Sequence, residues 1–216
     1  MSAAVVRPYR AADRDAVRAI AYAVGFMGEP ADWYWGDFPS FANIWTGYYT
    51  DHEPASAFVA EVDGRVVGFL VGCVDSATAP TAEDAIRREV LRRFLLLRPG
   101  TAGFLWRAVR DARHTPAPAT AVHDPRWPSH LHINLLPQAR RGGMGRQLVQ
   151  AWLARLRVIG SPGCHLTTMV ENQRAIAFFE RSGFRREGDP HLLPGMRLRT
   201  GERMHLQVMV QDLPRR

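Results

Sequence analysis

Residues 138–148 read Gln138-Ala139-Arg140-Arg141-Gly142-Gly143-Met144-Gly145-Arg146-Gln147-Leu148. An apolar run at 131–136 precedes this stretch, and a helical pattern of apolar residues follows it. A glycine-rich turn is therefore predicted between a strand and a helix N-terminus. Glycines let the main chain approach a ligand closely, and the first helical amides lack partners within the helix. Such a turn favours a phosphate or pyrophosphate, although a tight turn without a ligand would read the same way.

The size and composition of the chain fit one globular domain over residues 1–216. The chain has 216 residues, of which 46% are hydrophobic, enough for a sizeable core. No apolar run reaches the roughly 18 residues that span a bilayer. The N-terminus lacks the basic start and long apolar region of a signal peptide. We therefore expect a cytoplasmic protein without a membrane partner.

The charge of the chain comes from arginine, because the sequence contains no lysine and its 28 basic residues give a net charge of +7. Arginine binds phosphates through two parallel hydrogen bonds, so the excess suits a polyanionic ligand. Genome composition alone can produce the same bias. The arginines are scattered and no nucleic-acid motif is present, so we expect no nucleic-acid partner.

The cysteines and histidines give little sign of a metal site. Cys73 and Cys164 lie in apolar runs and are expected to be buried free thiols. His130 and His132 would point the same way on a strand, but no third ligand is evident and no cluster has zinc-ligand spacing. We therefore expect no bound metal.

Hydrophobic periodicity predicts alternating strands and helices. Strands are expected at 5–9, 57–62, 65–74, 130–136, 164–169, 184–187 and 204–210, and helices at 13–24, 41–50, 82–97, 101–112, 143–158 and 172–182. The early hairpin, turning at Asp63-Gly64, indicates an α/β fold with a mixed sheet and helices on both faces. Residues 76–128 break the pattern and are interpreted as a helical, proline-rich insertion too short for its own core.

Two motifs carry a family resemblance. The glycine-rich turn lacks the Gly-Lys-Ser/Thr of a Walker loop, and Leu148 stands where a dinucleotide fingerprint needs its third glycine. Arg140-Arg141-Gly142-Gly143-Met144-Gly145 instead resembles Arg/Gln-x-x-Gly-x-Gly/Ala, the acetyl-CoA pyrophosphate loop of the GNAT superfamily of N-acetyltransferases. Asn172-Gln173-Arg174-Ala175-Ile176-Ala177-Phe178-Phe179-Glu180-Arg181-Ser182-Gly183-Phe184 is similar to the family's Asn-x-x-Ala-x-x-Phe-Tyr-x-x-x-Gly-Phe segment.

The resemblance runs from Val5 to about Val210 and implies a GNAT-like fold. In that fold a central mixed, mostly antiparallel sheet has two parallel strands that splay apart at the acetyl-CoA cleft. The long segment before His130 and the strand end Gly72-Cys73-Val74-Asp75 further resemble the acetyltransferase-like domain of O-GlcNAcase and its bacterial relatives. Dimers are common in the superfamily, so a homodimer of this bacterial-type protein stays open.

The resemblance also implies acetyl-CoA (coenzyme A) as cofactor and an unidentified amine as acceptor. Main-chain groups would hold the pantetheine arm like an added strand, and loop amides would hold the pyrophosphate. The implied cofactor-binding residues are Leu135, Leu136, Arg140, Arg141, Gly142, Gly143, Met144, Gly145, Arg146, Asn172, Ala175, Phe178 and Phe179. Asn172 also fits a helix N-cap, Ala175 fits simple helix propensity, and Phe178 fits a core position.

Direct acetyl transfer needs a base, oxyanion donors and a proton for the leaving thiolate. His130, His132 and Asn134 share one face of their predicted strand, and His132 is the preferred base, with His130 second. Polar contact under a neighbouring helix is the alternative reading of these histidines. The resemblance implies the Leu135 amide as the oxyanion donor. Asp75 is a further candidate base, although it also fits a turn or cap.

Phe179 departs from the family pattern, because many members carry a tyrosine at this position and phenylalanine has no proton to give. A non-catalytic module that binds acetyl-CoA or a partner therefore stays open beside the N-acetyltransferase. An aromatic loop and the insertion as far as Trp127 are expected to wall the acceptor pocket, with nearby acids attracting the amine. The aromatic residues are Trp33, Tyr34, Trp35 and Phe38, and the acids are Asp32, Asp37, Asp51 and Glu53.

Overall fold

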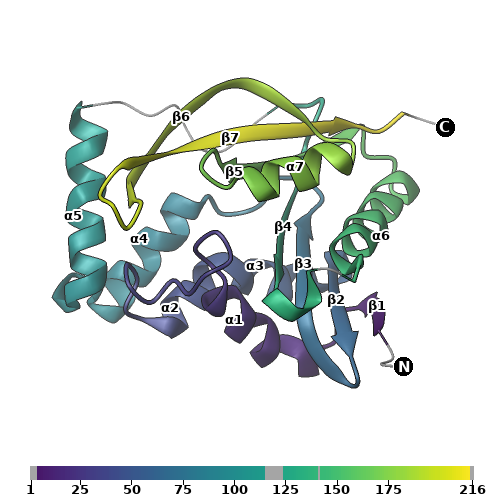
Figure 1. Ribbon diagram of the computed structural model, residues 1–216, viewed down its shortest axis with the longest axis horizontal. Coiled ribbons are helices and arrows are strands. Elements are labelled where there is room, and N and C mark those ends of the chain that lie inside the picture. The colour runs from purple at the N-terminus through teal and green to yellow at the C-terminus, as the bar shows by residue number, and fades with distance from the viewer. Residues whose placement is uncertain (1–3, 115–123, 141, 215–216) are drawn as a thin grey trace.

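A computed structural model describes residues 4–114, 124–140 and 142–214. Its strands form one sheet in the order β1-β2-β3-β4-β5-β7-β6 (Figure 1). The strands are β1 Ala4–Pro8, β2 Ala57–Val62, β3 Arg65–Cys73, β4 Ser129–Leu135, β5 Gly163–Met169, β6 Arg185–Arg197 and β7 Arg203–Asp212. Neighbouring strands run antiparallel except β4 and β5, which are parallel. The predicted α/β fold with a mixed, mostly antiparallel sheet is confirmed.

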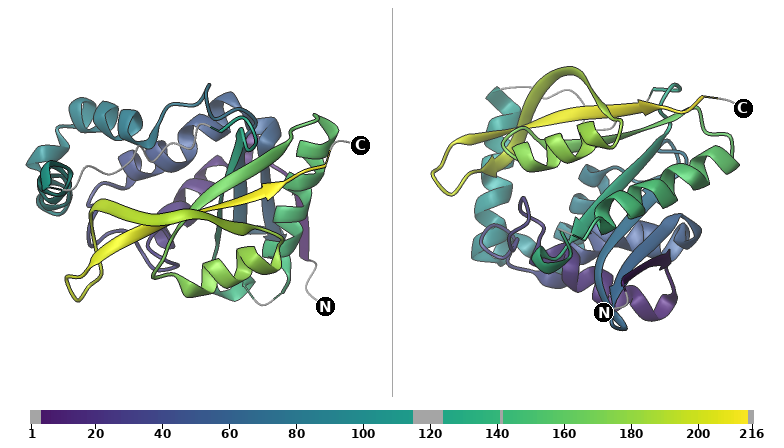
Figure 2. Two further views of the ribbon diagram at one scale, coloured as in Figure 1. Left: turned by 90° about the horizontal axis from the view of Figure 1, so that it is seen from above. Right: turned by 45° about the vertical axis from the view of Figure 1, so that its right-hand side comes forward.

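Helices cover both faces of this sheet (Figures 1 and 2). They are α1 Arg14–Ala23, α2 Phe38–Ala42, α3 Tyr48–His52, α4 Ala82–Arg93, α5 Pro99–His114, α6 Met144–Val158 and α7 Gln173–Arg181, with a π-helical turn at Asn43–Gly47. On one face, α6 and α7 bury Leu148, Trp152 and Ile176 in a single core. On the other, α1 and α3 bury Val17 and Tyr49 in a second core. The apolar spacing that predicted these helices is thus the spacing of their buried faces.

Several predicted bounds were wrong for local reasons. The helix expected at 82–97 ends at Arg93, because Phe94 adopts a left-handed conformation with φ of 51°. The helix expected at 41–50 lies within a longer continuous helical stretch from Phe38 to His52, in which α2 and α3 flank the π-helical turn. The short strand expected near 184–187 runs on to Arg197 as β6, with irregular register against β7. Gly188 and Pro190 hid this extension, since both residue types are rare inside strands.

Strands β4 and β5 stay paired only at one end. Their register contains Ser129 opposite Cys164 and His130 opposite His165, although both strands continue for several residues beyond. At the paired end the chains are very close, since a Cβ on Gly163 would lie 2.6 Å from the Arg126 carbonyl oxygen and 2.6 Å from Trp127 Cδ1. The two strands are therefore closed at one end and part towards the other.

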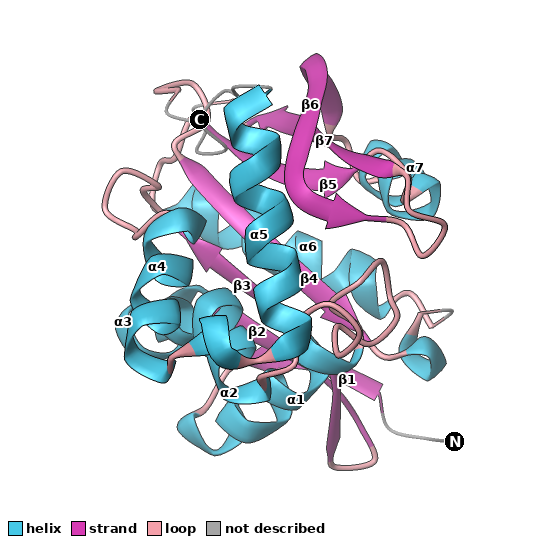
Figure 3. Ribbon diagram, turned by 90° about the vertical axis from the view of Figure 1, so that its left-hand side faces the viewer, coloured by secondary structure: helices cyan, strands magenta, loops and turns pink. Residues whose placement is uncertain are grey.

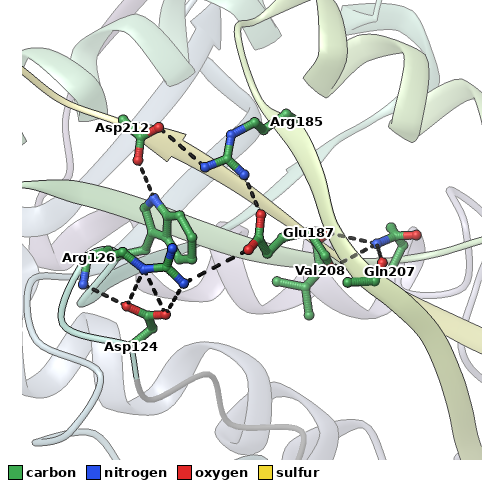
Figure 4. Close-up of polar contacts among 9 residues, drawn as sticks. Asp124, Arg126, Arg185, Glu187, Gln207, Val208 and Asp212 are labelled. Atoms are coloured by element: carbon green, nitrogen blue, oxygen red, sulfur yellow. Dashed lines mark hydrogen bonds and ion pairs between the residues drawn. The ribbon is translucent and has the colours of Figure 1, made fainter.

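Trp127 holds this closed end together. Its buried indole donates from Nε1 to Asp212 Oδ1 over 2.7 Å, which ties the start of β4 to the end of β7. The Arg126 guanidinium lies over the indole ring at 4.1 Å and that of Arg185 at 5.1 Å. Figure 4 shows the surrounding ion pairs, in which Arg126 and Arg185 share the carboxylates of Asp124, Glu187 and Asp212. Trp127 thus lies away from the acceptor pocket that it was expected to wall.

The insertion between β3 and β4 contributes α4 and α5. The second of these packs along β6, where Asp111 accepts from Arg197 over 2.7 Å and from the Gly195 amide over 2.9 Å. Within the described ranges, no helix combines the length and the apolar character that crossing a bilayer requires.

Replacing Gly163 by alanine is expected to lower the free energy of unfolding by about 1–3 kcal/mol, because the new methyl group would meet main-chain atoms that cannot rotate away. Urea denaturation followed by tryptophan fluorescence measures this change. Gly36→Ala is the matched control, since nothing lies within 4 Å of a Cβ at Gly36. Equal stability of the two variants would show that the closed end has room for a methyl group at Gly163.

Candidate active site

A cleft of about 2130 Å³ occupies the gap between β4 and β5 and continues beneath the insertion. Many of the predicted site residues line it, namely His130, His132, Leu135, Arg140, Gly143, Gly145, Arg146, Asn172, Ala175, Phe178 and Phe179. Among the described residues, the lining does not include Asp75, Leu136, Gly142 or Met144. Arg141 lies outside the described residues.

The N-terminus of α6 presents an open main chain to this cleft. Gly143 is the N-cap residue, with φ of 72° and no side-chain cap, so the first amides of the helix are left without a capping acceptor. Nothing lies within 4 Å of a Cβ placed on Gly143. At Gly145, by contrast, a Cβ would lie 3.3 Å from the Phe178 ring, so the glycine lets α6 and α7 pack closely. The end of this 15-residue helix is a suitable cradle for an anion.

Three arginines lie near this loop and differ in what their guanidinium groups do. Arg140 donates from Nε to the Leu135 carbonyl over 3.0 Å and from Nη2 to the Gly28 carbonyl over 2.9 Å. Arg140 therefore positions the end of β4, and its hydrogen bonds go to main chain. Arg174 was missed by the sequence reasoning, yet its exposed side chain lines the cleft beside Arg140 and Gly28. Arg146 also lines the cleft and is exposed, so these two arginines are available to an anion.

At the end of β4, the main-chain groups of Leu135 and Leu136 point to opposite sides of the strand. The Leu136 amide donates to the Val67 carbonyl over 2.9 Å, and its carbonyl accepts from the Ala139 amide over 3.0 Å. The amide and the carbonyl of Leu136 are thus both hydrogen-bonded within the protein. Leu136 therefore has no free main-chain donor with which to hold the pantetheine arm, as the resemblance had implied. Hydrogen-bonded residues alternate along an antiparallel pair, so the Leu135 amide points away from β3 into the gap towards β5.

The second motif forms the start of α7 and the opposite wall. Asn172 is an N-cap, with Oδ1 accepting from the Ala175 amide over 3.2 Å. Phe179 is only 6% exposed and packs against Phe184, whereas Phe178 is half-buried beside Gly145. Met144 likewise has a buried side chain that belongs to the core. The aromatic pair therefore shapes this wall mainly through packing, whereas Met144 belongs to the core.

The histidines of β4 meet a tyrosine from a distant helix. Tyr49 Oη lies 2.8 Å from His130 Nε2 and 2.9 Å from His132 Nε2. The other ring nitrogen of His130, Nδ1, lies 2.6 Å from Ser76 Oγ, and Ser76 itself donates to the Pro128 carbonyl over 2.7 Å. Among the described residues, no group of three or more potential metal ligands comes together.

This chain of hydrogen bonds determines which nitrogen of each ring carries a proton. Ser76 gives its one proton to the Pro128 carbonyl, so it accepts from His130 Nδ1–H. His130 Nε2 is then an acceptor for the Tyr49 hydroxyl, which in turn accepts from His132 Nε2–H. His132 Nδ1 is left with its lone pair on a side chain that lines the cleft. Three linked residues thus fix the basic atom of His132.

Burial keeps both imidazoles neutral. Desolvation, with a smaller contribution from His165, lowers the pKa of His132 to about 4. Desolvation likewise lowers the pKa of His130 well below its usual value. Burial raises the pKa of the Tyr49 phenol, so this residue stays protonated between the two rings. At neutral pH the three hydrogen-bonded side chains of His130, Tyr49 and His132 are therefore all uncharged.

Four of the other candidate acids are already engaged. Asp75 lies in a turn after β3, where its carboxylate accepts from the Ala77 amide over 3.0 Å, so it reads as a turn residue and not as a base. Asp37 caps α2 and lies near Arg98, Asp51 pairs with Arg14, and Glu53 accepts from Ser56 and from the Val74 amide. Tyr34, Trp35, Trp45 and Phe104 line this part of the cleft. The acceptor end is thus aromatic, and these four carboxylates are engaged within the fold.

Comparison with known proteins places the chain. The model of the acetyltransferase (GNAT) family matches residues 27–184. Similar solved structures include SsHAT, at 23% identity and a TM-score of 0.64 over 97% of this chain and 98% of that one. The ribosomal-protein-alanine N-acetyltransferase of Brucella melitensis has 19% identity and a TM-score of 0.58, over 97% and 99%.

A third structure is yncA of Salmonella typhimurium, a putative acetyltransferase solved with its cofactor acetyl-CoA, at 16% identity and a TM-score of 0.58 over 99% and 96%. These structures share the fold with this chain. The family model covers most of the sequence, including both motifs that border the cleft. The chain therefore belongs to the GNAT family of acetyltransferases.

Proposed function

We propose that the protein is an acetyl-CoA-dependent N-acetyltransferase, which moves an acetyl group to an amine of a small molecule or peptide by direct transfer. The observation that carries this proposal is the neutral His132, which lines the same cleft as the uncapped N-terminus of α6. N-acetyltransferases and a structure with acetyl-CoA among the similar folds support the choice of cofactor and reaction.

The residues at the cofactor end fit a nucleotide diphosphate. Amides of the first turn of α6 and the guanidiniums of Arg146 and Arg174 would hold it, while Arg140 keeps the end of β4 in place. Acetyl-CoA supplies an activated acetyl thioester when bound. The Leu135 amide, directed into the gap between β4 and β5, would donate to the oxyanion that forms during transfer.

His132 would take the proton from the attacking amine at Nδ1, directly or through a water molecule. As the ring gains positive charge, its Nε2–H donates more strongly to the Tyr49 hydroxyl. Tyr49 is held in turn by His130 and Ser76, so the ring needs no reorientation during transfer. His132 is then the base, and Tyr49, His130 and Ser76 are positioning residues.

Phe179 supports a second candidate function, a non-catalytic module that binds acetyl-CoA. Its ring cannot protonate a leaving thiolate, and it stands where many family members have a tyrosine. In the proposed enzyme, water would serve instead, because a thiolate is a good leaving group.

The narrower sequence-based inferences belong to this proposal as well. They are a single domain with an insertion at about 76–128, kinship with the acetyltransferase-like domain of O-GlcNAcase, a cytoplasmic location in bacteria, and a homodimer. The insertion formed by α4 and α5 supports the first. The proposal of function does not depend on any of them.

The direct test of the function is a screen of small amines and peptides for release of free CoA from acetyl-CoA. We expect at least one class of amine to stimulate release, with mass spectrometry showing a product heavier by one acetyl group. Binding of acetyl-CoA without release by any amine would instead support the non-catalytic module.

Gly143→Asp is expected to weaken acetyl-CoA binding by roughly tenfold or more in titration calorimetry, because a carboxylate at the helix N-terminus would repel the diphosphate. Gly64→Asp is the matched control. Its φ of 76° is close to the 72° of Gly143, and a Cβ there also meets nothing within 4 Å. Equal affinities of the two variants would place the diphosphate elsewhere.

His132→Ala is expected to lower kcat by roughly 10²–10⁴-fold with unchanged affinity for acetyl-CoA, because it removes the base and leaves the cofactor end intact. His205→Ala, at an exposed histidine paired with Glu171, is the control. Loss of cofactor affinity in the His132 variant would point to a structural role.

The pH profile follows from the same residue. Because the pKa of His132 lies at about 4, the imidazole stays neutral as pH falls through 6.5, and the base is lost only near pH 4. We therefore expect the pH profile of kcat/KM to contain no inflection near pH 6.5 that is due to His132. An inflection due to His132 would be present in the unchanged protein and absent in His132→Ala. Such an inflection would contradict the neutral hydrogen-bonded chain.

A further inference from the structure

Exposed apolar side chains gather on the insertion. We call this group the insertion patch, and its six residues are between 53% and 83% exposed: Leu91, Phe94, Leu96, Leu97, Trp106 and Val109. Figure 3 shows α5 on the outside of the molecule, facing the viewer, with α4 beside it. A groove of about 540 Å³ lies within the patch, between Leu96, Leu105 and Trp106. Several large apolar side chains exposed on neighbouring elements in this way point to an interaction site.

The local structure explains why these side chains point outward. Phe94, in its left-handed conformation, ends α4 and starts a 3-10 turn at Leu95–Leu97. Leu95 is fully buried and anchors the turn, whereas Leu97 is 83% exposed. On α5, Trp106 and Val109 lie three positions apart and so share one face of the helix. The buried Asp111 packs against β6 from another face, so the helix is firmly seated.

The charge around the patch is cationic. The stretch from 82 to 113 contains eight arginines and four carboxylates, which are Glu83, Asp84, Glu89 and Asp111. Glu89 and Asp111 are buried and paired with arginines, and Asp84 pairs with Arg87 over 3.1 Å. The exposed arginines of the patch are Arg87, Arg88, Arg92, Arg98, Arg110 and Arg113, and the Arg110 guanidinium lies 5.0 Å from the centre of the Trp106 ring. Exposed charge on this side is therefore mostly positive and is interleaved with apolar side chains.

We propose that the insertion patch docks onto an anionic membrane surface. Leucine, phenylalanine and tryptophan side chains enter the interfacial region, while arginines beside them meet lipid phosphates. A second copy of the chain would place arginines against arginines across the contact, which the charge disfavours. The proposal departs from the sequence-based expectation of no membrane partner, because the fold leaves these apolar side chains exposed beside the arginines and does not bury them.

The patch borders the acceptor end of the cleft. Leu96, Leu105 and Val109 line both the groove of the patch and the cleft itself. Docking would therefore bring the acceptor entrance close to the lipid headgroups. The binding does not require acetyl transfer, so it can be tested whether or not the protein is an enzyme.

The experiment is co-sedimentation of the full chain with vesicles. We expect binding to vesicles of phosphatidylcholine mixed with phosphatidylglycerol, much weaker binding to phosphatidylcholine alone, and a decrease as salt is raised. Equal binding to both vesicle types, or to neither, would overturn the proposal.

Matched variants separate the two contributions. Phe94→Asn with Leu97→Ser should abolish most of the binding, because it removes two exposed apolar side chains, and Leu97 is the most exposed residue of the patch. Asparagine tolerates the left-handed backbone of Phe94, so the variant should fold. Val158→Asn, at an equally exposed valine on α6, should leave binding intact. Arg110→Gln with Arg113→Gln should weaken it by roughly fivefold per arginine, whereas Arg65→Gln with Arg157→Gln should not.

Two outcomes would contradict docking through this patch. If the apolar variant binds anionic vesicles as well as the unchanged chain, the attraction is general electrostatics. If sedimentation velocity shows a dimer that the apolar variant dissociates, the patch is covered by a second copy of the chain.

Discussion

The site depends on how briefly β4 and β5 stay together. Their ladder includes two residue pairs and then ends, so the main chain of β4 beyond His130 faces a gap where a neighbouring strand would otherwise lie. An open gap inside a sheet is costly unless something holds its closed end, because unpaired amides lose hydrogen bonds. Trp127 supplies that hold through Asp212 and two stacked guanidiniums, and Gly163 lets the strands touch there. The cleft is therefore the consequence of a tight junction at its far end.

The alternation of β4 then places two kinds of chemistry on either side of one strand. Leu131 faces the core under α6, while His130 and His132 face α3 and meet Tyr49. The same strand directs the Leu135 amide into the gap. Burial that would leave a lone histidine without hydrogen bonds is offset here by a continuous chain ending at the Pro128 carbonyl. A strand that is fixed on both faces can hold the proposed base and the proposed oxyanion donor at a constant distance from each other.

Features that depend on a few neighbouring residues could be predicted from the sequence. The glycine turn before α6 and the Asn172 cap of α7 are examples, because each is encoded within one turn of chain. Tyr49 and Ser76 could not be found this way, since their partners lie about 80 and 50 positions away and their own sequence surroundings are ordinary. Phe94 shows a further limit. The residues around Phe94 all favour a helix, so the sequence does not predict its left-handed conformation. The helix ends at this residue, and Leu96 and Leu97 in the following turn are exposed.

The insertion is best understood from the side of α5 that the fold does not use. One side is committed to β6 through Asp111 and Phe104, and a helix seated in this way normally carries polar residues on its outer face. Here the outer face carries Trp106 and Val109 beside arginines. Exposing these apolar side chains to water costs free energy that polar side chains in the same places would not cost. A solvent-facing surface alone does not explain that pattern. Contact with a negatively charged apolar boundary does, and it uses the tryptophan, the leucines and the arginines together.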